Sequence, residues 1–192
     1  MTKPKILAFA GSTRTDSYNK KLVKIASTGA TEGGADVTVI DLRDFPMPIY
    51  DGDLEQKDGL PSNARKLKDL MLTHQGFLIS SPEYNSSISA VFKNTIDWAS
   101  RQSESEIPLA CFKNKVAGIM SASPGMLGGL RGLVHVRSIL GNIGVIVLPD
   151  QIAIAKAHEA FNEDGTLKDK KQEDQVKKIG YNVAKILLKL ND

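Results

Sequence analysis

The chain has 192 residues, 41% of them hydrophobic and 24% charged, which suits one domain over 1–192 and leaves little room for disorder. Its net charge of +3 comes from lysines interleaved with acidic residues, as in 168–178, which favours a solvated helix face over a nucleic-acid surface. Apolar runs such as Gly144 to Leu148 are far shorter than the roughly 20 residues of a membrane span. The first residues also lack the apolar stretch of a secretory signal, so we expect no membrane span and a cytoplasmic location.

Apolar runs alternate with segments of helical period along the whole chain, a pattern typical of a parallel sheet wrapped by helices. In chain order, strands are expected at Lys5 to Ala10, Asp36 to Asp41, Gly76 to Ser80, Lys115 to Ser121 and Val145 to Pro149. Helices are expected between and after them, at Asn19 to Gly29, Ser62 to His74, Ser89 to Arg101, Leu130 to Asn142 and Lys170 to Leu190. The continuous apolar character of the strands favours burial on both faces.

The last expected helix has the clearest amphipathic pattern. Its apolar residues recur at steps of three and four and should form one stripe packed on the sheet: Val176, Ile179, Val183, Ile186, Leu187 and Leu190. Five successive β units predict an α/β fold, a doubly wound five-stranded parallel sheet of order 2-1-3-4-5 with helices on both faces. A ligand then binds beyond the carboxyl ends of the strands, so the loops after Ala10, Ser80 and Ser121 are the candidates.

The first loop, Gly11 to Asn19, is rich in hydroxyls and amides and holds one guanidinium, that of Arg14. Together with the N-terminus of the following helix, these groups are typical of a phosphate site. The alternative is an ordinary turn with Ser17 or Asn19 as the helix cap. Neither a Gly-x-Gly-x-x-Gly nor a Gly-Lys-Ser/Thr motif is present, which favours a terminal monophosphate over a pyrophosphate.

The second loop runs from Ser81 to Ser86. Pro82 stiffens it, Tyr84 offers a flat face and Asn85 offers donors and acceptors, a combination suited to the edge of a polar heteroaromatic ring. We do not expect Glu83 to be a general base, because the spacing gives it no partner. It either contributes backbone contacts or bonds to a neighbour.

The third loop, Ser121 to Gly129, is rich in glycine. Glycines let a backbone approach a flat ligand closely, and they are equally suited to a flexible connection with unusual turn geometry. The sequence leaves these alternatives open.

Other reactive residues are few. The single cysteine, Cys111, excludes an internal disulfide and a multi-cysteine metal site, and we expect it to be a small apolar residue beside a strand. The histidines, His74, His135 and His158, lie far apart in the sequence and form no metal-ligand motif. We expect no metal site.

The three loops together resemble the NADPH-dependent FMN reductase family, which includes bacterial quinone and chromate reductases and azoreductase-like enzymes. The residues at Gly11 to Asn19 are similar to the family's FMN-phosphate loop, and those at Ser81 to Asn85 are similar to its isoalloxazine loop. The segment 92–98 resembles its usual helix, and 48–51 resembles a further family segment. The resemblance spans nearly the whole chain.

This resemblance implies a flavodoxin-like domain that binds FMN. The residues expected to hold the FMN phosphate are Ser12, Arg14, Ser17 and Asn19. Those expected to line the flavin ring are Pro82, Glu83, Tyr84 and Asn85, with Ser123 as a contact from the third loop. The family usually forms dimers or tetramers, so a homodimer or homotetramer is expected, in which a neighbouring subunit helps to close the site.

The implied activity is electron transfer from NADPH or NADH through bound FMN to a small acceptor: a quinone, an azo compound, chromate or a flavin. Because FMN supplies this chemistry, no catalytic side chain is assigned. One alternative is a flavodoxin-type electron carrier without its own NAD(P)H oxidation, although the net charge of +3 provides no acidic docking surface. Another is a regulatory or interaction module that keeps the fold without flavin.

Overall fold

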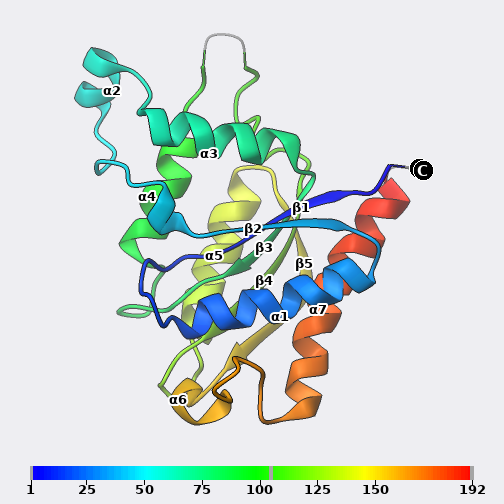
Figure 1. The fold of residues 1–192 in the computed structure, drawn as a ribbon. Coiled ribbons are helices and arrows are strands. Elements are labelled where there is room, and N and C mark those ends of the chain that lie inside the picture. The colour runs from blue at the N-terminus through cyan, green and yellow to red at the C-terminus, as the bar shows by residue number, and fades with distance from the viewer. Residues whose placement is uncertain (1, 104–105, 191–192) are drawn as a thin grey trace.

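The computed structural model of the chain describes residues 2–103 and 106–190. Within these ranges, five parallel strands form one sheet of order β2-β1-β3-β4-β5 (Figure 1). The strands are β1 (Lys5–Ala10), β2 (Asp36–Ile40), β3 (Gly76–Ser80), β4 (Val116–Ala122) and β5 (Ile146–Ile154). The strand order and parallel pairing confirm the predicted doubly wound topology.

The helices cover both faces of this sheet. They are α1 (Tyr18–Glu32), α2 (Gly52–Asp58), α3 (Ser62–Thr73), α4 (Ala90–Ala99), α5 (Leu130–Asn142), α6 (Ala157–Ala160) and α7 (Lys170–Leu190), with a short 3-10 helix, η1 (Leu42–Asp44). The helices α1 and α7 pack on one face, and α3, α4 and α5 pack on the other. The short elements η1, α2 and α6 were not predicted from the sequence.

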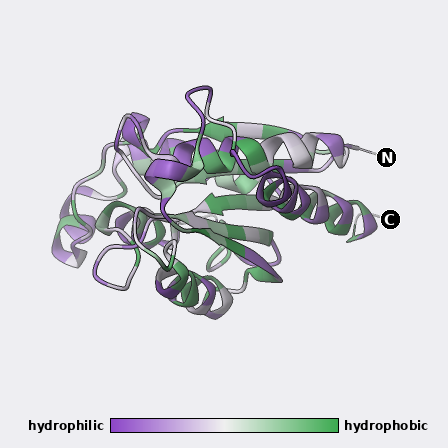
Figure 2. Cartoon of the chain, turned by 90° about the horizontal axis from the view of Figure 1, so that it is seen from below, coloured by the Kyte–Doolittle hydropathy of each residue, from purple (hydrophilic) through white to green (hydrophobic). Residues whose placement is uncertain are grey.

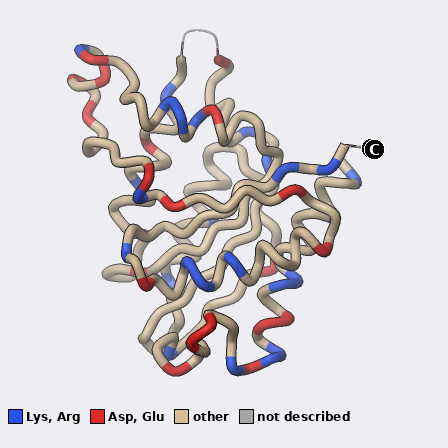
Figure 3. Tube along the Cα trace, in the orientation of Figure 1, with Lys and Arg blue, Asp and Glu red and all other residues tan. Residues whose placement is uncertain are grey.

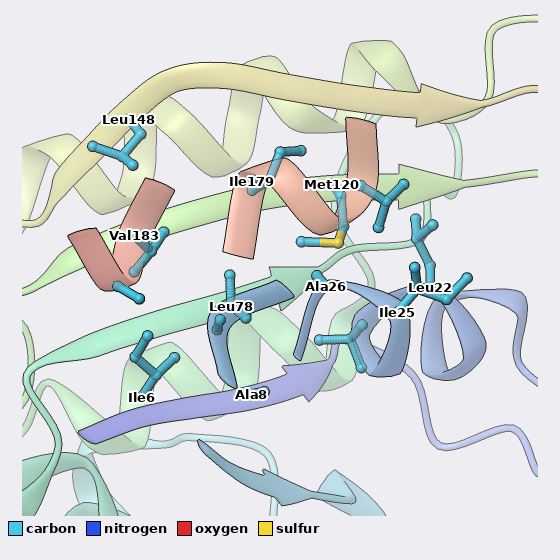
Figure 4. Close-up of a cluster of buried hydrophobic side chains, with 14 of the residues drawn as sticks. Ile6, Ala8, Leu22, Ile25, Ala26, Leu78, Met120, Leu148, Ile179 and Val183 are labelled. Atoms are coloured by element: carbon cyan, nitrogen blue, oxygen red, sulfur yellow. The ribbon is translucent and has the colours of Figure 1, made fainter. Parts of the chain in front are cut away.

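Successive strand residues point to opposite faces of the sheet and divide the core into two clusters. Ile6 and Ala8 belong to the cluster under α1 and α7, whereas Leu7 and Phe9 belong to the cluster under α3, α4 and α5. Figure 4 shows the first cluster, with side chains from the strands and from both helices meeting in one layer. In Figure 2 the strands are largely green, as expected for a sheet buried on both faces.

The two helices of the first face touch backbone to backbone. A Cβ atom on Gly29 would lie 1.9 Å from the carbonyl oxygen of Lys177, and one on Gly180 would lie 1.9 Å from that of Ala26. Close packing here therefore requires glycine on both helices. The predicted apolar stripe of α7 faces the core, except that Leu190, at the end of the helix, is 61% exposed.

The strand β5 differs most from its prediction. It was expected to end at Pro149 but continues to Ile154, and its pairing with β4 shifts register midway. The guanidinium of Arg137 donates to the carbonyl oxygens of Val147 at 3.2 Å and Leu148 at 2.8 Å. These bonds satisfy backbone groups that leave the ladder at the irregularity, so the strand can resume beyond it.

No helix in the described ranges is both long and apolar enough to cross a membrane. In the first part of α7, over 170–178, positive and negative side chains alternate in pairs (Figure 3), whereas the later charged residues, Lys185 and Lys189, are both positive.

Candidate functional site

The loops after β1, β3 and β4 meet at the carboxyl edge of the sheet, where the sequence placed the ligand site. They surround a cavity of about 180 Å³. Of the predicted site residues, this cavity is lined by Ser12, Arg14, Ser17, Asn19, Pro82, Glu83, Tyr84 and Ser123. Asn85 does not line it. Tyr18, Ala122 and Pro124, which were not named as site residues, also contribute.

The N-terminus of α1 opens toward this cavity. Ser17 occupies the N-cap position, but its side chain makes no capping hydrogen bond, and the first turn holds no acidic residue. Of the two residues named in the alternative of an ordinary capped turn, Ser17 is thus the N-cap by position, without a bond from its hydroxyl. The first N–H groups of a helix have no partner within the helix and carry a partial positive charge. With Ser12 and the exposed Arg14 beside them, these groups form an arrangement suited to a phosphate.

Asn19 is buried and fixes this helix end to the sheet. Its Nδ2 donates to the carbonyl oxygen of Ala122 at 2.9 Å, and its Oδ1 accepts from the Ala122 N–H at 3.0 Å and from the Ser80 hydroxyl at 2.8 Å. Most of the hydrogen-bonding capacity of the amide is therefore used within the protein. The structure gives Asn19 a positioning role, and direct contact with a phosphate stays a prediction.

Arg43 of η1 fixes the other side of the first loop. Its Nε donates to the carbonyl oxygen of Thr13 at 3.0 Å, its Nη2 donates to the same oxygen, and its Nη1 donates to the Thr15 hydroxyl at 3.1 Å. Sequence reasoning missed this residue, because its main partner is a backbone oxygen that leaves no sequence signal. Arg43 therefore links η1 to the first loop at two residues.

The tip of the second loop is a two-residue turn. The backbones of Tyr84 and Ser87 exchange hydrogen bonds of 2.9 and 3.0 Å, and the intervening Asn85 and Ser86 have φ of 50° and 65°. Two successive positive φ values are typical of a type I′ turn, which Asn tolerates well. The turn carries Asn85 past the cavity, while Tyr84 stays at its rim with 51% of its side chain exposed.

Glu83 bonds to a neighbour, one of the two alternatives left open by the sequence. Its Oε1 accepts from Arg131 at 2.9 Å (Nε) and 2.6 Å (Nη2), and its Oε2 accepts from the Gly132 N–H at 3.0 Å. Burial alone would raise the pKa of Glu83, but these hydrogen bonds and the charge of Arg131 hold the pKa below its usual value. The N-terminus of α5 is thus closed by an internal carboxylate, whereas that of α1 is open.

Two glycines of the third loop are required by the local backbone conformation and by close packing. Gly128 and Gly129 have φ of 61° and 94°, and a Cβ on Gly129 would lie 1.9 Å from the Ser121 hydroxyl oxygen. That hydroxyl is buried and finds no partner among the described residues. Turn geometry thus explains both glycines. Ser123 is half-buried at the cavity wall, and its hydroxyl accepts from the Gly125 N–H at 3.3 Å.

The chain matches the family model described as NADPH-dependent FMN reductase over residues 4–159. It is 33% identical to "Probable NADPH:quinone oxidoreductase 2" of Oryza sativa subsp. japonica, over 98% of this chain and 93% of that protein. It is 32% identical to an NAD(P)H-dependent FMN reductase of Pseudomonas aeruginosa, over 90% and 89%. The solved structure of the flavoenzyme NAD(P)H:(acceptor) oxidoreductase FerB from Paracoccus denitrificans matches with a TM-score of 0.80 at 26% identity, covering 97% of this chain and 98% of that one.

Proposed function

Because the chain belongs to the NADPH-dependent FMN reductase family, we propose that it is an oxidoreductase that passes electrons from NAD(P)H through bound FMN to a small acceptor such as a quinone. The observation that carries this proposal is the open N-terminus of α1, which faces a cavity walled by the second and third loops. In this proposal the phosphate would lie at the helix N-terminus and the flat ring between the two loops.

The donor set fits a terminal monophosphate. The hydroxyls of Ser12 and Ser17, the guanidinium of Arg14 and the first N–H groups of α1 would hold it. Arg43 and Asn19 keep these donors in place before the ligand arrives, which reduces the entropy lost on binding.

The flavin ring would lie between the second and third loops. Pro82, Glu83 and Tyr84 would border it on one side and Ser123 on the other. FMN, when bound, supplies the redox chemistry, accepting hydride from the nicotinamide and delivering electrons to the acceptor. The protein's part is to orient the ring and to leave one face reachable. Asn85 would contact the flavin ring only from the exposed turn beside Tyr84.

The cavity of about 180 Å³ is smaller than the roughly 300–1,000 Å³ of common ligand pockets, so much of the ring would lie at an open surface. Beside it, in the third loop and the start of α5, the apolar side chains of Met126, Leu127 and Leu130 are 73%, 50% and 44% exposed. We propose that a second copy of the chain covers them in a homodimer or homotetramer. Sedimentation of the wild type and of Leu130→Glu tests this: a monomeric wild type contradicts it.

We propose NADPH or NADH as the transient electron donor. We also propose a cytoplasmic location, because these donors are maintained there. Quinones, azo compounds, chromate and free flavins all suit an open ring face.

Titration with FMN, followed by NAD(P)H oxidation with and without a quinone, tests the function. The proposal predicts a yellow 1:1 complex that oxidises NAD(P)H rapidly when the quinone is present. A complex that binds FMN but does not oxidise either nicotinamide would indicate a flavodoxin-type carrier. A protein that does not bind FMN would indicate a module without flavin.

A further inference from the structure

We propose that Glu83 and Arg131 form a positioning pair that fixes the second loop to α5 and sets the charge environment of the flavin ring. The inference rests on the proposed function, because it concerns the same site. Neither residue is proposed to transfer a proton or hydride. Their role is to hold the loop and to keep two opposite charges at fixed positions near the bound ring.

The geometry supports a rigid connection. Three hydrogen bonds of 2.6 to 3.0 Å join the Glu83 carboxylate to the Arg131 guanidinium and to the Gly132 N–H. The Cβ of Glu83 also lies against α5, since it would be 3.3 Å from a Cβ built on Gly132. Four residues along the loop, the Ser87 hydroxyl is 2.8 Å from Nδ1 of His135, also on α5. The loop is therefore attached to one helix at two points on either side of the Asn85–Ser86 turn.

The third loop leads directly into the same helix. Gly129 is the N-cap of α5, and the position of its missing Cβ is 3.6 Å from the Glu83 Cβ. The start of α5 thus touches both loops between which the ring would lie. Of the two attachments, the Glu83 carboxylate is the one that lies at the cavity, so its removal should alter the space between the loops.

The two charges differ in their surroundings. The side chain of Glu83 is 8% exposed and lines the cavity, whereas that of Arg131 is 58% exposed. Reduced FMN is more negative than oxidised FMN, so a nearby carboxylate disfavours the reduced form and a nearby cation favours it. Loss of Glu83 should raise the affinity for reduced FMN relative to oxidised FMN, and loss of Arg131 should lower it. A purely structural role would not produce opposite signs.

The chain offers a matched control in Glu173. Its carboxylate is also 8% exposed and accepts from a backbone N–H, that of Leu167 at 3.0 Å, and from a cation, Lys170 at 2.9 Å. It does not line the cavity between the loops. Glu173→Gln therefore reports the general cost of neutralising a buried carboxylate at the start of a helix.

The experiment measures the dissociation constants of oxidised and anaerobically reduced FMN for the wild type, Glu83→Gln, Arg131→Gln, the double variant and Glu173→Gln. We expect Glu83→Gln to weaken the binding of oxidised FMN about tenfold. The ratio of the two dissociation constants should change by about three- to tenfold in favour of reduced FMN. A tenfold shift corresponds to about 30 mV in the midpoint potential. Arg131→Gln should shift the ratio the other way by less, because water screens an exposed charge. The double variant should lie between them.

Unchanged ratios in both single variants, or shifts of the same sign in both, would contradict the proposed role of the Glu83–Arg131 pair. If Glu83→Gln does not fold, Arg131→Gln decides alone, because its side chain is largely exposed: a ratio equal to that of Glu173→Gln refutes the proposal. A wild type that does not bind FMN refutes the proposed function instead. The two failures are therefore distinguishable.

Discussion

The side chain of Asn19 exchanges two hydrogen bonds with the backbone of Ala122, 2.9 Å from Nδ2 to the carbonyl oxygen and 3.0 Å from the Ala122 nitrogen to Oδ1. The amide takes the place of a neighbouring strand at the end of β4. Because Ser80 donates to the same Oδ1 at 2.8 Å, one side chain joins the first turn of α1 to the ends of two strands. The open N-terminus of α1 is held against the sheet by this contact.

Asn19→Ala should destabilise the protein by about 3 kcal/mol, because it leaves buried backbone and hydroxyl groups without partners. It should also weaken FMN binding, since the end of α1 is no longer fixed. Urea unfolding of the apoprotein measures the first effect and titration the second. Asn182→Ala is the control, because that half-buried side chain makes one bond, to Asp150. Equal stability of the two variants would contradict the positioning role.

Arg14→Gln should lower FMN affinity by about 10- to 100-fold. This factor corresponds to the roughly 1.5–3 kcal/mol that a hydrogen bond to a charged group contributes. Riboflavin, which lacks the phosphate, should bind the variant as it binds the wild type. The comparison isolates the phosphate, because both ligands carry the same ring. An equal loss for both ligands would place Arg14 elsewhere in the site.

Arg43→Ala should lower FMN affinity about tenfold without removing any proposed contact to the ligand. Arg43 bonds to Thr13 and Thr15, so its loss frees the first loop and binding must order it again. Lys93→Ala is the control for the loss of one positive charge, because Lys93 pairs with Asp97 on the surface of α4. Isothermal titration should show a more unfavourable binding entropy for Arg43→Ala alone. Identical FMN affinities for the two variants would contradict the proposed ordering of the loop.

The sequence was sufficient for the architecture because apolar runs alternate with helical segments along the chain, and the central strands β1, β3 and β4 are buried on both faces. It was insufficient for β5, where the apolar run stops at Pro149 and polar residues follow, because Arg137 satisfies the displaced carbonyl groups. The short helix α2 was missed because it has no buried residue and hence no apolar period.

At the site, residue types and loop positions predicted which segments would meet. They did not predict what each side chain bonds to. Asn19 was expected to bind a phosphate, and its partners in the structure are the backbone of Ala122 and the hydroxyl of Ser80, 103 and 61 residues away in the chain. Glu83 and Arg43 likewise bond to groups that only the folded chain brings near. Asn85 lies on a turn with two positive φ values that carries it past the cavity, and its contact with the flavin ring stays a prediction.

A buried ion pair gives the stability a defined dependence on pH. Lys68 is 1% exposed, and its Nζ lies 2.6 Å from Oε2 of Glu106, which also pairs with Arg65. Burial alone would raise the pKa of Glu106, but the bonds from Lys68 and Arg65 outweigh it and lower the pKa. Such a carboxyl stabilises the fold above its unfolded pKa of about 4.3, and that contribution is lost as the pH falls through the folded pKa.

Glu106→Gln should therefore cost about 3 kcal/mol at neutral pH, because it leaves a buried charge unpaired. The difference from the wild type should shrink as the pH falls below the unfolded pKa of about 4.3, and it should be smallest below the lowered folded pKa, where the Glu106 carboxyl is neutral as well. Urea unfolding across the pH range measures it. A difference that stays constant down to pH 3 or so would contradict the ion-pair explanation.

Cys111 should be inert toward thiol reagents in the native protein. It is fully buried, and burial raises the pKa of its thiol to about 11, so the reactive thiolate is scarce. Labelling should begin only as urea unfolds the chain and should follow the loss of helical signal. Rapid labelling without urea would show that the core opens locally at this position.

Anaerobic stopped-flow mixing of the FMN-loaded protein with NADPH, and separately with NADH, tests the central claim most directly. We expect the flavin absorbance to bleach with at least one nicotinamide, at a rate no slower than steady-state turnover with a quinone, and to return when the quinone is added. Flavin absorbance that does not bleach on the turnover timescale with either nicotinamide would contradict it.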